Sequence, residues 1–162
     1  MRKNTVLLTT GIAAAVVLSL VAMSCGSSTD VNSKVYVATL LPANEVPPKT
    51  SAGSGVATFD DVGTEIDWTL ELTNMTGVTL SHIHLGPAGV APPGNIIENL
   101  FIPLSATPTV NGVVMQGSIT NANNPAVSLD SLRVLFNNGG AYVNVHTSVN
   151  PGGEIRGQIA LR

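Results

Sequence analysis

Three histidines are the residues of this chain best suited to chemistry, and they fall in two short segments. His82 and His84 stand in Leu-Ser-His-Ile-His-Leu-Gly, and His146 closes Tyr-Val-Asn-Val-His. Side chains two residues apart on a β-strand point to the same side, so the first two would present their imidazoles to one space. Neutral imidazole is a good ligand for copper or zinc. A third histidine at the end of another strand therefore predicts a metal site formed by His82, His84 and His146.

Such a site makes a further demand, because the second N–H of a metal-bound imidazole normally donates to a carboxylate or a carbonyl. Glu154 and the backbone of residues 86–89 are the candidates for this role. A structural interpretation stays open beside the metal site. Val78 and Leu80 share the parity of the first two histidines, so the imidazoles could instead face the core and bond to loop carbonyls.

The sequence offers no other catalytic set. Asp130 is the only acidic residue between Glu98 and Glu154, so a Ser-His-Asp triad cannot be argued from the pattern. No glycine-rich loop leads into a helix as phosphate sites require, and the only cysteine lies near the N-terminus. The adjacent Asp60 and Asp61 stand at a predicted turn, where solvation is their expected role. We therefore predict no catalytic residue, and the histidines are predicted as metal ligands only.

The elements that must position the histidines are predicted to be short antiparallel strands. From residue 34 onward, apolar runs alternate with turn residues, which is typical of an all-β domain. The clearest strand covers residues 65–72, where Ile66, Trp68 and Leu70 share one face with Leu72. Further strands are predicted at residues 35–41, 55–59, 78–85, 113–119, 141–146 and 155–161.

One helix is predicted among these strands. Residues 127–136 fit helical spacing, with Leu129, Leu132, Leu135 and Phe136 on a common face, and residues 137–140 would end it. Antiparallel strands at this spacing favour a sandwich or a barrel. The predicted fold is an all-β, antiparallel, immunoglobulin-like β-sandwich with at most one short helix.

Composition limits the function classes. Only 10% of the 162 residues are charged, and seven basic residues stand against ten acidic ones. No cluster of lysine or arginine occurs beyond the first three residues, so the chain lacks the charge pattern of a nucleic-acid-binding protein. The apolar fraction of 44% can supply one packed domain. Residues 42–54 and 86–95, rich in proline and glycine, are predicted surface loops.

The N-terminus has the pattern of an export signal. Two basic residues, Arg2 and Lys3, precede an uncharged run that is apolar mainly between residues 6 and 22. Cys25, the only cysteine, follows that run in Ala-Met-Ser-Cys-Gly, which resembles the lipobox of bacterial lipoproteins. The place of this cysteine favours lipid attachment over two alternatives, a signal without lipid and an uncleaved helix that spans the membrane.

Cleavage before Cys25 would divide the chain into three parts. Residues 1–24 would be the lipoprotein signal peptide, residues 25–33 a flexible tether, and residues 34–162 the folded domain. Removing 24 of the 162 residues would leave 138. We expect this protein in the cell envelope, held to the membrane by its lipid. In a host with two membranes we expect it at the outer membrane or the surface, because Gly26 rather than aspartate follows the cysteine.

Four segments resemble the CHRD domain family, in the family's order. Leu-Leu-Pro-Ala-Asn-Glu-Val-Pro-Pro at 40–48 is similar to the opening of that domain, and Gly-Ser-Gly-Val-Ala-Thr-Phe at 53–59 is similar to its next strand. His-Ile-His-Leu-Gly at 82–86 is similar to its central His-x-His-x-Gly. The closing segment at 142–158 is the most specific, with Tyr-Val-Asn-Val-His-Thr and then Pro-Gly-Gly-Glu-Ile-Arg-Gly-Gln. Pro42 departs from the family, which often has glycine there.

The resemblance implies an immunoglobulin-like β-sandwich at residues 34–162, and it implies little about biochemical role. CHRD domains are named after chordin, a secreted developmental antagonist, and they also occur singly in exported bacterial proteins. This chain has none of the cysteine-rich modules through which chordin binds its growth factors. That function is therefore not expected here.

A second resemblance bears on the chemistry of the histidines. Copper/zinc superoxide dismutases also combine a β-sandwich with an early His-x-His, a later histidine, and an arginine near the C-terminal strand, here Arg156. This likeness implies copper ligation by the three histidines. The fourth histidine, the zinc loop and the cysteine pair of those enzymes are missing. We expect a binding protein for a metal ion, or for a surface protein or glycan. The alternatives are a copper-dependent oxidoreductase and a purely structural module of the cell surface.

Overall fold

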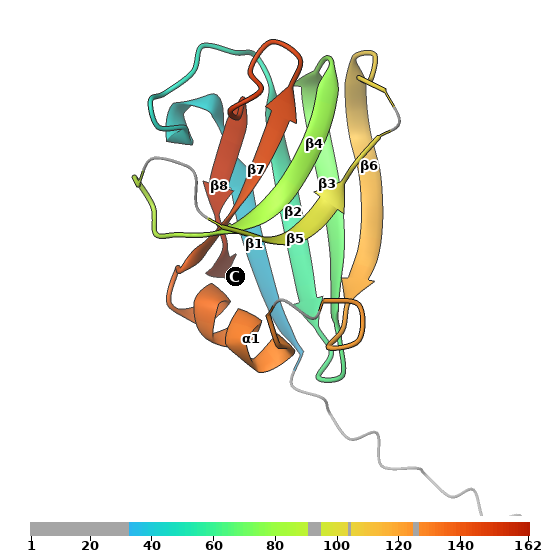
Figure 1. The fold of residues 1–162 in the computed structure, drawn as a ribbon, viewed down its shortest axis with the longest axis vertical. Coiled ribbons are helices and arrows are strands. Elements are labelled where there is room, and N and C mark those ends of the chain that lie inside the picture. The colour runs from blue at the N-terminus through green and yellow to red at the C-terminus, as the bar shows by residue number, and fades with distance from the viewer. Residues whose placement is uncertain (1–32, 91–94, 104, 125–126) are drawn as a thin grey trace, which may run out of the picture.

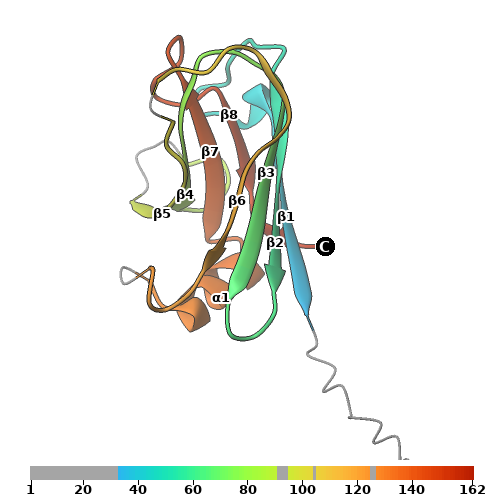
Figure 2. The same cartoon turned by 90° about the vertical axis from the view of Figure 1, so that its right-hand side faces the viewer.

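The computed structural model describes residues 33–90, 95–103, 105–124 and 127–162. Within these residues, two antiparallel sheets pack face to face, and one α-helix lies at one end of the pair (Figures 1 and 2). The predicted all-β antiparallel sandwich with one short helix is confirmed. In chain order the elements are β1 (Lys34–Leu40), the 3-10 turn η1 (Pro42–Asn44), β2 (Ser54–Asp61), β3 (Ile66–Met75), β4 (Val78–Leu85), β5 (Ile96–Phe101), β6 (Val110–Ile119), α1 (Leu129–Asn137), β7 (Ala141–Thr147), β8 (Ile155–Gln158) and β9 (Ala160–Leu161).

The first described strand begins at Lys34, where the sequence places the start of the folded domain. The predicted signal peptide, Cys25 and all but the last residue of the predicted tether lie outside the described residues. In the part of the chain that the structure describes, no helix is long and apolar enough to cross a membrane.

The five-stranded sheet, of order β6-β3-β2-β1-β9, follows the predicted alternation. Tyr36 of β1 pairs with Phe59 of β2, which in turn pairs with Trp68 of β3, and all three side chains are buried. The four apolar residues of the predicted inner face of β3 are all buried as expected. Across the sheet Trp68 pairs with Gly117 of β6, where a Cβ atom would lie 2.9 Å from the indole. Glycine at that position leaves room for the ring.

The four-stranded sheet, of order β5-β4-β7-β8, turns one face to the core and the other face to polar residues. Ile83 of β4 pairs with Val143 of β7, and both belong to the hydrophobic core. Their neighbours along each strand, including the two histidines of β4, point the other way. A β-bulge between Val78 and Leu80 lets Val78 enter the core while the histidines face away from it. Counting the alternation of side chains from Val78 alone would therefore place the imidazoles on the core face of the sheet, which is the wrong one.

Helix α1 closes one end of the sandwich (Figure 1). Of the predicted face, Leu129, Leu132 and Phe136 are buried, and Leu135 is partly buried against the core. The Phe136 ring lies 5.3 Å from the ring of Tyr36 and 5.2 Å from the ring of Phe59. The helix begins two residues later than predicted, because the side chain of Ser128 caps it by accepting from the Ser131 N–H.

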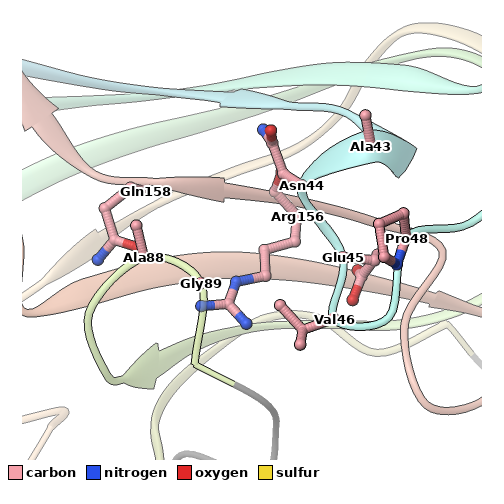
Figure 3. Close-up of a pocket in the computed structure, with 9 residues that line it drawn as sticks. All are labelled: Ala43, Asn44, Glu45, Val46, Pro48, Ala88, Gly89, Arg156 and Gln158. Carbon is pink, nitrogen blue, oxygen red and sulfur yellow. The ribbon is translucent and has the colours of Figure 1, made fainter.

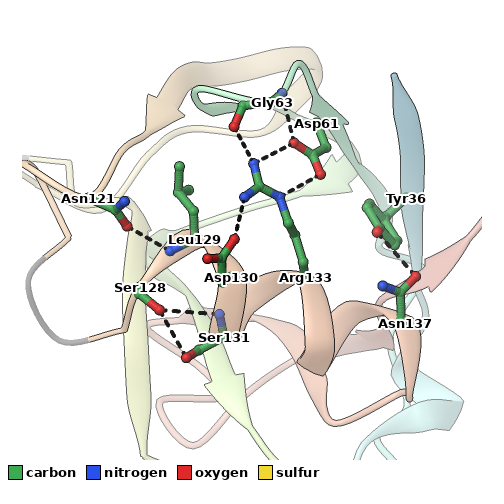
Figure 4. A network of polar contacts seen from close by, with 10 residues as sticks. All are labelled: Tyr36, Asp61, Gly63, Asn121, Ser128, Leu129, Asp130, Ser131, Arg133 and Asn137. Atoms are coloured by element: carbon green, nitrogen blue, oxygen red, sulfur yellow. Dashed lines mark hydrogen bonds and ion pairs between the residues drawn. The ribbon is translucent and has the colours of Figure 1, made fainter. Parts of the chain in front are cut away.

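An ion pair fastens this helix to the five-stranded sheet (Figure 4). Arg133 Nε and Nη2 donate to the two carboxylate oxygens of Asp61 at 2.8 and 2.9 Å, and Nη2 also donates to the Gly63 carbonyl at 2.6 Å. The bond from Arg133 lowers the pKa of Asp61 below its usual value, against the effect of burial. The expectation that Asp61 is solvated is wrong. The carboxylate is buried because the guanidinium satisfies both of its oxygens.

Two elements differ from the sequence prediction. Strand β5 was not predicted, because Ile-Ile-Glu-Asn-Leu-Phe groups its apolar residues in pairs and does not alternate them. Its pairing with β4 has two register shifts, which matches that irregular pattern. The last predicted strand divides at Ile159, and β9 leaves the four-stranded sheet to pair with β1 in the other one.

Replacing Trp68 by alanine should lower the free energy of unfolding by about 3–5 kcal/mol, because the cavity left beside Gly117 cannot collapse fully. Glu71→Ala, on the exposed face of the same strand, is the matched control and should stay within about 0.5 kcal/mol of wild type. Urea unfolding followed by circular dichroism measures both. A loss below 1 kcal/mol for Trp68→Ala would show that the indole does not support the core.

Candidate metal centre

The pairing of β4 with β7 places three histidines on one face. His82 pairs with Asn144, and Leu80, two residues earlier, pairs with His146. Residues paired across antiparallel strands have their side chains on the same side, so His146 lies diagonally next to His82. One nitrogen from each of the three rings lies within 4.8 Å of the other two. The predicted convergence of His146 on the pair in β4 is confirmed.

The spacing of the rings suits a metal ion. His82 Nδ1 lies 3.2 Å from His146 Nε2. Two nitrogens bound to a tetrahedral zinc at ~2.0–2.1 Å would be separated by about 3.3–3.4 Å. The three candidate ligand nitrogens lie within 4.8 Å of one another, which is looser than the spacing around a bound ion, so the set has to tighten to hold one. His82 and His84 are buried and His146 is partly exposed, which gives solvent access on one side only.

Hydrogen bonds determine which nitrogens carry protons. His146 Nδ1 lies 2.9 Å from the Pro151 carbonyl oxygen, which only accepts, so this nitrogen is the donor. In the neutral ring His146 Nε2 then has a free lone pair, and the proton between the two rings belongs to His82 Nδ1. A metal ion at this position would replace that proton and move His82 to the other tautomer.

Burial keeps the imidazoles of His82 and His146 neutral. Burial, together with the nearby His146 and His84, lowers the pKa of His82 to about 4. The pKa of His146 is also lowered by burial, with its bond to Pro151 acting in the opposite direction. Neutral imidazole is the form that binds metal, so protons do not compete with a metal ion at neutral pH.

The residues expected to support the imidazoles have other partners. Glu154 accepts from the Ser51 hydroxyl at 2.6 Å, from Thr147 Oγ1 at 2.5 Å and from Asn150 Nδ2 at 3.2 Å. These bonds fold the turn between β7 and β8, and it is the Pro151 carbonyl of that turn that meets His146. In the loop after β4, the Gly86 and Pro87 carbonyls accept from side chains of β8.

Sequence reasoning did not foresee how far the polar surface extends beyond the histidines. We call this surface the polar face, and its buried or half-buried members are His82, His84, Tyr142, Asn144, His146, Arg156 and Gln158. The Tyr142 ring stacks on His84 at 5.1 Å between centroids, and the Arg156 guanidinium lies 3.7 Å from the centre of the same ring. A signal was present in the alternation Tyr142, Asn144, His146, which is a polar stripe on an otherwise apolar strand.

The arrangement can hold one ion through three neutral nitrogens and leave a further position open toward solvent. Copper and zinc both accept such a set, and an open fourth position lets a bound ion take a water or another small ligand. Within the described residues, these three histidines are the only group of metal-ligating side chains found close enough together.

Comparison with known proteins is consistent with this geometry. A family model described as the CHRD domain matches residues 36–159, which include all three histidines and the turn that carries Pro151. No curated protein and no solved structure matches the chain.

The apo protein should show both His82 and His146 as Nδ1–H tautomers in long-range 1H–15N spectra, with His82 titrating at a pKa of about 4. Between pH 6.5 and that value the unfolded chain binds a proton at this residue that the folded protein does not, so stability should fall as the pH falls. In His82→Gln, the acid-induced loss of unfolding free energy should be smaller than in wild type by on the order of 2–3 kcal/mol. A normal titration of His82 near pH 6.5 would contradict the burial and contacts described.

Proposed function

The chain belongs to the CHRD domain family, and on that premise we propose that it is an exported, lipid-anchored binding protein of the cell envelope that holds one copper or zinc ion through His82, His84 and His146. The single observation that carries the proposal is the convergence of all three histidines of the chain on one side of the β4–β7 pair.

The proton arrangement supports a ligand role. The bond from His146 Nδ1 to the Pro151 carbonyl orients that ring, so its Nε2 lone pair faces the other two histidines. A carbonyl partner of this kind is the usual support of a metal-bound imidazole. The ion would supply a positive charge and an exchangeable coordination position, and the protein would supply the three nitrogens, their orientation and the shielding from bulk water.

Binding is the function that these residues support better than catalysis. A dismutase of the copper/zinc type needs a second metal and the residues that hold it. Beyond the three histidines, no second cluster of ligating residues is found in the described part of the chain. Copper bound without superoxide turnover would therefore agree with the proposal, and copper bound with turnover would favour the oxidoreductase.

Purified protein should bind one Cu(II) or Zn(II) per chain and gain several degrees in melting temperature at neutral pH, because the ion binds the folded state alone. His84→Ala should lose the bound ion and the thermal shift. Ser81→Ala is the matched control, because Ser81 is on the same strand, faces the core, and has a hydroxyl without a hydrogen-bond partner. Elemental analysis and calorimetry measure both properties. Equal metal content in wild type and His84→Ala would reject the three-histidine site.

The proposed anchor is tested separately from the metal. In the native host, a radioactive fatty acid should label the wild-type protein, and Cys25→Ser should carry no label because no other cysteine is present. Membrane fractionation should move the variant from the membrane to the soluble exported fraction. Equal labelling of the two proteins would remove the lipoprotein assignment and leave the metal site untouched.

A further inference from the structure

A cavity of about 410 Å3 lies next to the polar face, and the proposed metal binding does not use it (Figure 3). It opens between the segment around η1 and the loop after β4, with β8 beneath. Its polar lining comes from both ends of the domain: Asn44 and Glu45 from the opening segment, and Arg156 and Gln158 from the closing one. The first and last of the four segments by which the chain resembles its family thus meet at this cavity.

Arg156 is a buried cation without an acidic partner in contact. It is 2% exposed, and its two terminal nitrogens donate to the Val90 and Pro87 carbonyls at 2.7 and 3.0 Å. Among the described residues, the ion pairs within 4.0 Å are those of Arg133. A guanidinium has five N–H donors, so Arg156 retains donors beyond the two loop carbonyls.

Glu45 is the matching buried acid across the cavity. It is also 2% exposed, and its Oε1 accepts from Asn144 Nδ2 at 2.6 Å. Burial raises the pKa of Glu45, while the charge of Arg156 acts in the opposite direction without direct contact. Gly153 packs closely against the side chains of Glu45 and Asn144, because a Cβ there would lie 2.8 Å from Glu45 Oε1. The backbone therefore fixes the position of the carboxylate.

A third polar group of the cavity lacks a partner. The Gln158 amide nitrogen is within bonding distance of the Gly86, Gly139 and Ala141 carbonyls, which fixes the direction of its side chain. Its oxygen is buried and has no hydrogen-bond partner. An unsatisfied buried acceptor in a cavity that also holds two unpaired opposite charges is costly unless a ligand completes it.

We propose that this cavity binds a small zwitterion of the α-amino acid class, with the carboxylate directed to Arg156 and the ammonium group directed to Glu45. The two protein charges cancel, so a simple anion would be repelled by Glu45 and a simple cation by Arg156. A neutral sugar would leave both charges unpaired. A zwitterion pairs both charges within one ligand. The volume exceeds that of the common backbone group and leaves space for a side chain.

The test uses calorimetry on purified metal-free protein with the common L-amino acids as probes. At least one should bind with a millimolar or lower Kd. Its N-acetyl derivative, which lacks the ammonium charge, and its amide, which lacks the carboxylate, should each bind at least about tenfold more weakly. These derivatives test the role of Arg156 without a substitution that would also release the loop carbonyls.

Glu45→Gln should weaken binding of the free amino acid by at least about tenfold, and it should leave the affinity for the N-acetyl derivative unchanged. Glu98→Gln, at a carboxylate outside the cavity lining, is the matched control and should bind as wild type. The titrations use metal-free protein, so failure of the metal site and failure of this site can be told apart. Absence of binding by every amino acid would overturn the proposal. It would also be overturned if blocked derivatives bound as well as free ones, or if glucose or sucrose bound and amino acids did not.

Discussion

On the outer face of the β5-β4-β7-β8 sheet, polar side chains are buried under loops, and each has to find a partner inside the protein. His82, Asn144 and Arg156 form one row across three strands, and His84, Tyr142 and Gln158 form the next. An ordinary sandwich exposes this face to water. Here the loops lie over this face, and their carbonyl groups accept hydrogen bonds from its buried side chains.

The loops are held by the polar face in return. Arg156 and Gln158 bond the carbonyls of the loop after β4, and Asn144 holds Glu45 of the segment around η1. Glu154 ties the turn between β7 and β8 to Ser51. The composition of these segments gives them no regular structure, so their shape depends on side chains that come from β7, β8 and the turn between them. The same side chains leave three imidazoles together at one end of the face and two opposite charges around a cavity at the other.

Much of this fold follows from local sequence pattern. The alternation around Trp68 identified β3 and its inner face, and the spacing of Leu129, Leu132 and Phe136 identified α1. The three histidines could be grouped because residue type and spacing both pointed to one face. Strand β5 does not alternate, so periodicity could not find it.

The contacts between distant segments were beyond reach of the sequence. The β-bulge after Val78 switches the face of the sheet to which the following side chains point, and no residue type in the sequence marks it. Alternation counted from Val78 therefore gives the wrong face. Glu154 is close to His146 in the sequence, but its hydrogen bonds go to residues of the turn between β7 and β8. The Pro151 carbonyl, and not Glu154, bonds to the His146 imidazole. Arg156 and Glu45 are 111 positions apart, and only the sheet order brings their segments to one cavity.

X-ray absorption spectroscopy of the metal-loaded protein tests the central claim most directly, because it reports the atoms bound to the ion. The account predicts a shell with three imidazole nitrogens at ~2.0–2.1 Å for zinc, together with one light atom from water or another small ligand. A shell built from oxygen atoms, or one with fewer than three imidazoles, would contradict the claim that His82, His84 and His146 hold the metal.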